Sequence, residues 1–145
     1  MNILVDANIL VRLCDASSEH HTPCAEAVQR AIDTGCVLMV CTQTLIEYWV
    51  VATRPTDANG LGLTPAQAEA DLQDFVLTFH VLPEPPDIIV GWRELVMRYG
   101  VSGRPAHDTR YVALMRAHGI VHLLTLNPRD FKRYTEITCL APADI

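Results

Sequence analysis

The sequence predicts an α/β fold: a three-layer α/β/α sandwich with a five-stranded parallel sheet. Short, uniformly apolar runs, typical of strands buried on both faces, alternate along the chain with longer stretches of helical spacing. Of the 145 residues 50% are hydrophobic, enough for one domain over residues 1–145 to bury its own core.

The chain opens with a buried strand. Residues 2–6 are apolar up to Asp6, and Asn8 can cap the helix that follows. A second helix is expected over about 20–34, where apolar residues recur with helical spacing and Gly35 provides a stop.

A second strand leads into an apolar helix. Residues 36–41 are uniformly apolar and partly β-branched, as in a strand buried on both faces. A helix opened by Thr42 or Thr44 runs to about Thr53, and residues 54–62 form a loop with an Asn-Gly turn. Because this helix is apolar nearly all round, we expect its start to be buried.

The alternation continues in the second half. A helix over about 64–78 has Pro at its first position, residues 80–82 form a short strand, and a helix over about 87–99 stops at Gly100. The next helix, over about 104–119, also begins with Pro and ends at Gly.

Two further strands, 121–125 and 137–140, complete the sheet. Strands that alternate with helices in this way pair in parallel. In such sheets ligands gather at the carboxyl ends of the strands. Asp6 ends the first strand and Asn127 follows the fourth, so both side chains should face one crevice.

Charge is unevenly distributed along the chain. The net charge of −6 argues against a general nucleic-acid coat, yet residues 91–145 carry eight basic and five acidic side chains. A basic half on an acidic protein suits a polyanion contacted at one edge, although solvated helix faces would explain it equally well.

Several other classes of protein are disfavoured. No apolar run reaches the ~18 residues of a membrane span, and the first residues lack a basic leader, so we expect a cytoplasmic protein. The five cysteines form no Cys-x-x-Cys pair, and we interpret them as small buried hydrophobic residues.

Asp6 and Asn8 lie where the first strand meets the first helix. Helix capping would explain one of these side chains but does not need both. An ionised acid beside apolar sequence is costly without a partner, and acids from distant segments can share one divalent cation. We predict Asp6 as a metal ligand and Asn8 as a residue that supports it or caps the helix.

Glu47 and Asp108 are further candidates, each with a local alternative. Thr44 and Glu47 have the spacing of a capping box, and an acid in a first helical turn, like Asp108, favours the helix dipole. However, the apolar neighbours of Glu47 predict burial. Asp108 shares a helix face with Val112 and Met115, which turns it toward the core. Buried carboxylates need partners, so we predict both as metal ligands.

The fourth candidate position is open between Asn127 and Asp130. Asn before Pro is a common turn signal, and Asp130, among basic neighbours, could be a solvated surface acid. Thr125, at the end of the fourth strand, could hydrogen-bond another acid or a water at the site.

Four segments together form a recognisable combination: LVDANIL at 4–10, Glu47 in its apolar helix, HDTRYVALMRAHG at 107–119 and LLTLNPRDF at 123–131. Any one of them is a weak signal. In this order they resemble the PIN-domain family, and within it the VapC-type toxins of bacterial toxin–antitoxin pairs. The resemblance covers nearly the whole chain.

The resemblance implies the strand order 3-2-1-4-5, an endoribonuclease that uses Mg²⁺ or Mn²⁺, RNA as substrate, a cognate antitoxin as partner and frequent homodimers. It places Asp6, Glu47 and Asp108 on the metal-binding acids of the family, and Asn127 or Asp130 on the fourth position. Since an amide carries no charge, one tightly bound ion is expected rather than two. Among the basic residues, the strongest candidates for holding the flanking phosphates are Arg104, Arg110 and Arg129.

Two other functions stay open. A phosphotransfer hydrolase would need a second Asp where Asn8 stands and a lysine in the site, and the only lysine is Lys132. A PIN-like binding or regulatory module without catalysis would be separated from the enzyme by its metal occupancy.

Overall fold

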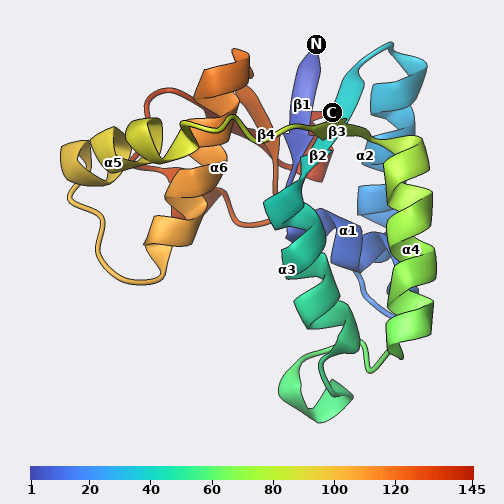
Figure 1. Ribbon diagram of the computed structural model, residues 1–145. Coiled ribbons are helices and arrows are strands. Elements are labelled where there is room, and N and C mark those ends of the chain that lie inside the picture. The colour runs from blue at the N-terminus through green and yellow to red at the C-terminus, as the bar shows by residue number, and fades with distance from the viewer.

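The computed structural model describes residues 1–145 and contains a parallel sheet in the order β3-β2-β1-β4-β5 (Figure 1). The strands are β1 (Asn2–Val5), β2 (Val37–Cys41), β3 (His80–Leu82), β4 (His122–Leu124) and β5 (Thr138–Leu140). In the centre, Leu4 of β1 lies opposite Met39 of β2 and Leu123 of β4. The predicted fold class and strand order are confirmed.

Helices cover both faces of the sheet (Figure 1). One face carries α1 (Ala7–Leu13), α2 (His21–Asp33), α3 (Thr42–Thr53) and α4 (Pro65–Thr78). The other face carries α5 (Ile88–Arg98) and α6 (Pro105–His118). Three short 3₁₀ turns were not predicted: η1 (Thr56–Ala58), η2 (Pro128–Phe131) and η3 (Pro142–Asp144). No helix of the chain has both the length and the apolar character needed to cross a membrane.

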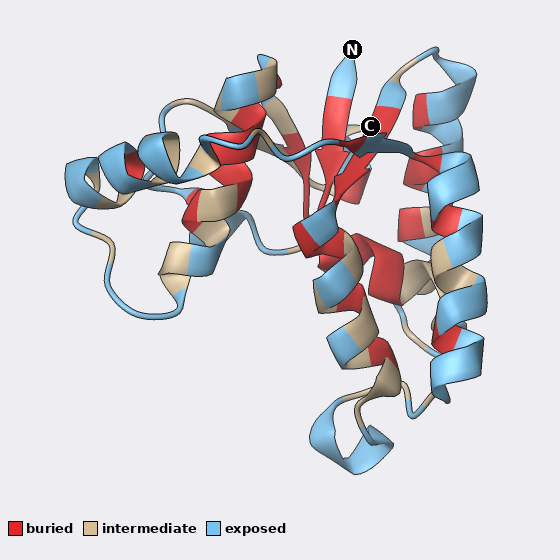
Figure 2. Ribbon diagram, in the orientation of Figure 1, coloured by how far each residue is buried: buried red, intermediate tan, exposed pale blue.

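Two hydrophobic clusters lie on opposite sides of the sheet, and Figure 2 shows the central strands buried between them. Alternate strand residues point to opposite faces. Toward α1–α4 point Ile3, Val5, Leu38, Val40 and Leu124. Toward α5 and α6 point Leu4, Met39, Cys41 and Leu123. Burial on both faces explains why these runs are uniformly apolar rather than alternating.

Two predictions about helix starts need correction. α1 begins directly after Asp6, so Asn8 lies in its first turn and does not cap it. At the start of α3 the Cys41 backbone N–H donates to Thr44 Oγ1 at 3.3 Å, so the capping interaction joins these two residues and not Thr44 with Glu47. Glu47 lies further inside the helix, and its carboxylate is therefore free of any capping role.

The start of α3 is largely buried at Gln43 and Thr44, as expected, but burial does not follow the apolar residues around the rest of the helix. Tyr48 and Ala52 pack in the core, whereas Ile46 and Val50 are 55% and 52% exposed. α3 packs against α1 and α4, and Figure 1 shows α3 and α4 extending beyond the sheet, so only one face of α3 is covered.

Candidate acidic site

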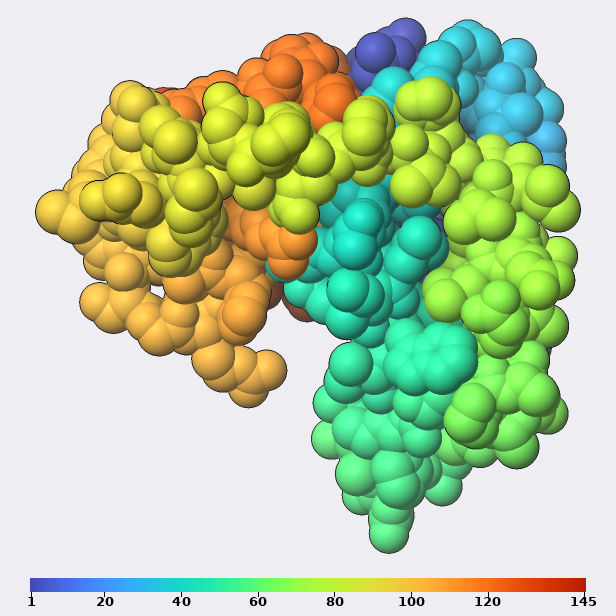
Figure 3. Space-filling view, viewed as in Figure 1, coloured from blue at the N-terminus to red at the C-terminus, as the bar shows by residue number.

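The candidate residues gather at the carboxyl edge of the sheet. β1 and β2 lead directly into α1 and α3, while Thr125 follows β4. Figure 3 shows a hollow on the molecular surface between α3 and the segment that enters α6. The acids come from four separate parts of the chain, with Asp6 after β1, Glu47 in α3, Asp108 in α6 and Asp130 in η2.

Asp6 is held by a small polar network. The Thr125 hydroxyl donates to Asp6 Oδ2 at 2.6 Å, and Asn8 Nδ2 donates to the same oxygen at 3.0 Å and to Thr125 Oγ1 at 3.2 Å. Asn8 Oδ1 in turn accepts from the Leu126 backbone N–H at 3.2 Å. Asn8 and Thr125 thus fix the position of the Asp6 carboxylate.

The Asp6 carboxyl is almost completely buried, with 8% of the residue exposed. Burial raises its pKa to about 6; the Thr125 hydrogen bond opposes this rise, whereas the charges of Glu47 and Asp130 add to it. The ionised form is therefore costly in the absence of a positive partner.

Glu47 is clamped through both of its oxygens. Gln43 Nε2 donates to Glu47 Oε1 at 2.8 Å, and the Tyr111 hydroxyl donates to Oε2 at 3.0 Å. The Gln43 amide also donates to the backbone carbonyl of His107 at 2.8 Å, which ties the start of α3 to the start of α6. Burial, followed by the charges of Asp6 and Glu47, raises the pKa of Tyr111 well above its usual range, so the hydroxyl keeps the proton that it donates.

Asp108 lies in the first turn of α6 and is partly buried. Its pKa is raised to about 6, first by burial and then by the charges of Asp130, Asp6 and Glu47, while the charge of His107 opposes the rise. The charges of four acids from four segments thus act on one another, and we call these acids the acid group: Asp6, Glu47, Asp108 and Asp130.

Asp130 and Asn127 differ in their relation to this group. Asp130 lies in η2, and its charge acts on both Asp6 and Asp108. Both residues are exposed, and the backbone N–H of Asn127 donates to Thr125 Oγ1 at 3.0 Å. The carboxylate therefore contributes charge to the group, whereas Asn127 contributes a backbone contact.

None of the four acids takes part in an ion pair with a basic side chain. Mutually repelling carboxylates without a basic partner are a donor set that suits a hard divalent cation. No three of the acids approach closely enough to enclose an ion by themselves. Mg²⁺ often takes only one or two carboxylates and keeps several waters, so this open arrangement fits it.

The three candidate arginines have different environments. Arg110 pairs with Glu84 through two hydrogen bonds, from Nε at 2.7 Å and from Nη2 at 2.8 Å, and the Arg110 hydrogen bond lowers the pKa of Glu84. Arg104 and Arg129 are exposed and take part in no ion pair. The charge of Arg110 is thus already balanced, and those of Arg104 and Arg129 are not.

Sequence reasoning missed Gln43 and Tyr111. Gln43 precedes Glu47 by four residues, a spacing that places both side chains on one helix face, so this contact could have been found. Tyr111 reaches Glu47 from another helix across 64 positions, and nothing in the local sequence signals that contact.

Comparison of the sequence with known families finds a match to the PIN domain over residues 3–137. No curated protein matches the sequence significantly.

Several solved structures resemble the fold. DNA-bound VapBC from Salmonella typhimurium superimposes with a TM-score of 0.68 at 19% identity and covers 98% of both chains. VapBC-1 from nontypeable Haemophilus influenzae gives 0.68 at 15% identity, with 99% of both chains covered. VapC20 from Mycobacterium tuberculosis, a toxin that cleaves the sarcin–ricin loop, gives 0.62 at 20% identity and covers 83% of this chain and 86% of that one. At these identities the likeness shows a shared fold.

Proposed function

This chain belongs to the PIN-domain family, and we propose that it is a metal-dependent endoribonuclease, the toxin of a toxin–antitoxin pair. The observation that carries the proposal is the gathering of Asp6, Glu47, Asp108 and Asp130 at one edge of the sheet without a basic partner. The fold likeness to VapBC structures and to an RNA-cleaving toxin supports the toxin role.

Asp6, Glu47 and Asp108 would hold Mg²⁺ or Mn²⁺, directly or through the waters that the ion keeps, with Asp130 rather than Asn127 as the fourth acid. Oxygen ligands favour these hard ions. Asp130 is preferred because its charge already acts on Asp6 and Asp108, and a neutral amide would not have this effect.

A bound cation would polarise a phosphoryl oxygen and favour attack by water on the phosphodiester. The protein residues prepare the site for this chemistry. Thr125 and Asn8 fix Asp6, and Gln43 and Tyr111 fix Glu47, so little reorganisation is needed at the moment of reaction. No side chain of the site would form a covalent bond to the substrate.

The RNA would be held at its phosphates by the unpaired cations Arg104 and Arg129. A cognate antitoxin, a homodimer and a cytoplasmic location complete the proposal, and they are supported by the resemblance to VapC-type toxins.

Hydrolysis of a single-stranded RNA in Mg²⁺ tests the proposal. Wild type should cleave, EDTA should stop the reaction, and Asp108→Asn should lose cleavage while it still folds. Asp57→Asn, a change to an exposed acid far from the site, is the control. Metal binding without cleavage would indicate a binding module instead, and cleavage by Asp108→Asn at the wild-type rate would contradict the assignment of the site. In cells, Asp108→Asn should likewise relieve growth arrest caused by expression.

A further inference from the structure

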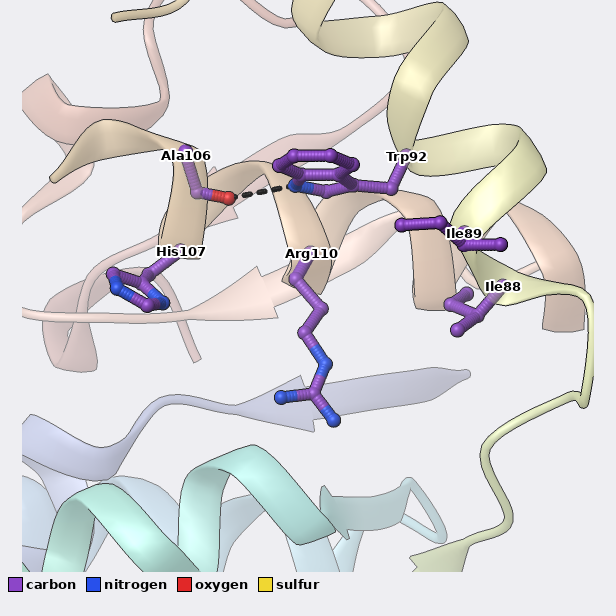
Figure 4. Close-up of a pocket in the computed structure, with 6 residues that line it drawn as sticks. All are labelled: Ile88, Ile89, Trp92, Ala106, His107 and Arg110. Atoms are coloured by element: carbon purple, nitrogen blue, oxygen red, sulfur yellow. Dashed lines mark hydrogen bonds between the residues drawn. The ribbon is translucent and has the colours of Figure 1, made fainter. Parts of the chain in front are cut away.

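A cavity of about 210 Å³ lies between α5 and the first turns of α6, outside the acid group (Figure 4). Its lining consists of Ile88, Ile89, Trp92, Ala106, His107 and Arg110. Figure 4 shows the Trp92 ring reaching from α5 toward α6, with the isoleucines beside it and the Arg110 side chain extending below. The proposed nuclease chemistry uses none of this apolar surface.

Two planar groups in the cavity wall are fixed in place. Trp92 Nε1 donates to the Ala106 carbonyl at 2.8 Å, which holds the indole ring against α6. Glu84 holds the Arg110 guanidinium through two hydrogen bonds of 2.7 and 2.8 Å. Aromatic rings and guanidinium planes are the surfaces on which unpaired RNA bases stack.

The charges around the cavity favour an uncharged ring over a phosphate. Most of the lining is apolar, and the one permanent positive charge, on Arg110, is balanced by Glu84. A phosphate bound to Arg110 would also meet the Glu84 carboxylate. A flat, uncharged ring with polar edges fits the aromatic wall and the polar His107 and Arg110 side chains at the same time.

The cavity adjoins the acidic site. His107 lines the cavity, and its backbone carbonyl accepts the hydrogen bond from Gln43, the residue that also holds Glu47. The next residue in the chain is Asp108. The cavity and the acidic site therefore share the first turn of α6.

We propose that this cavity is a subsite for one unpaired nucleobase of the substrate RNA, next to the phosphate at the acids. The inference rests on the proposed function, which supplies RNA as the ligand. It also changes the role of Arg110, from a phosphate contact to a planar wall of a base-binding cavity.

Two neighbouring residues of α5 provide a matched test. Ile89 and Val90 are 53% and 57% exposed, but only Ile89 lines the cavity. Binding of a fluorescein-labelled single-stranded oligoribonucleotide is measured in EDTA, so that the RNA stays intact. Ile89→Glu should weaken binding roughly 5- to 100-fold, the value of one stacked base, while Val90→Glu, with the same charge change, should leave it unchanged. Equal affinities of the two variants for RNA would overturn the subsite. This result would also be expected if the cavity bound a side chain of a protein partner instead of a base.

Trp92 itself can report which part of a nucleotide binds. The chain has two tryptophans, and the variant Trp49→Phe retains only Trp92. Adenosine should quench its fluorescence, and ribose 5-phosphate should not. Quenching by ribose 5-phosphate alone, or by neither compound, would overturn the assignment to a base.

The two proposals can fail separately. RNA cleavage in Mg²⁺ together with equal binding by the Ile89 and Val90 variants would remove the subsite and keep the nuclease. Absence of cleavage together with weakened binding by Ile89→Glu would keep a base-binding cavity and remove the nuclease.

Discussion

The Thr125 hydroxyl donates a 2.6 Å hydrogen bond to Asp6 Oδ2 and so joins the carboxyl ends of two neighbouring strands, 119 positions apart in sequence. This hydrogen bond lowers a pKa that burial raises, and therefore favours the ionised carboxylate that a cation needs. Asn8 donates to both partners, which makes the pair part of one network.

Thr125→Val should weaken Mn²⁺ binding near neutral pH by roughly 10- to 100-fold, because residues that hydrogen-bond a metal ligand have effects of this size. Thr125→Ser retains the hydroxyl and should bind almost as wild type does. Calorimetric titration of Mn²⁺ into the three proteins checks this expectation. Similar affinities of the Val and Ser variants would show that the hydroxyl has no part in metal binding.

Gln43→Met should also weaken divalent-ion binding and RNA cleavage by about 10- to 100-fold, because it releases Glu47 Oε1 and the contact with the His107 carbonyl. The matched control is Gln29→Met. Gln29 donates to Asp33 at 2.8 Å with the same four-residue spacing, but on an exposed part of α2. If both changes had the same effect, the Gln43 clamp would have no functional role.

Neutralising Asp6 should stabilise the metal-free protein near neutral pH. Its pKa rises from 3.8 to about 6 on folding, so the native state holds this proton more tightly than the unfolded state does. The ionised carboxyl then destabilises the fold above about pH 6, and this cost disappears as the pH falls below about 4. In EDTA, the free energy of unfolding of Asp6→Asn should exceed that of wild type by up to ~3 kcal/mol at about pH 7.5, with little difference at about pH 4. Denaturant unfolding at both pH values measures this difference, and a gap that does not depend on pH would refute the assigned pKa.

Arg104→Gln and Arg129→Gln should each weaken RNA binding and reduce the slope of log K against log salt by about 0.7, the value for one phosphate of a single strand. Arg98→Gln is the control, because Arg98 is already paired with Glu136 at 2.7 Å. Salt titrations of RNA binding give the slopes. If the slope fell by the same amount in all three variants, the effect would come from net charge and not from contacts at the site.

The sequence allowed the sheet, its order and the position of the acids to be predicted, since these depend on local patterns and on strand ends. Asp6 ends an apolar run, and this alone places it at the carboxyl edge of the sheet. The exposed side of α3 could not be predicted in the same way. Ile46 and Val50 are as apolar as their buried neighbours, and the packing of α1 and α4 against α3 decides which face is covered.

Contacts between distant segments explain the other differences. Arg110 was expected to be free for phosphate, but Glu84, 26 positions away, balances its charge. The choice between Asn127 and Asp130 likewise depends on the conformation of the turn after β4, where Asn127 precedes η2 and Asp130 lies within it, and the residue types do not determine that conformation. Local sequence thus pointed to Asp6, Glu47 and Asp108 and left the fourth position open, and the contacts that hold these side chains depend on the tertiary structure.

Titration of Mn²⁺ into wild type and Asp6→Asn, followed by calorimetry, tests the central claim most directly, namely that the gathered acids hold a divalent cation. Wild type should bind Mn²⁺ at least about 10-fold more tightly than Asp6→Asn at neutral pH, and it should release protons on binding because the raised pKa of Asp6 leaves part of the carboxyl protonated. Equal binding by the two proteins, or no binding by either, would contradict the account.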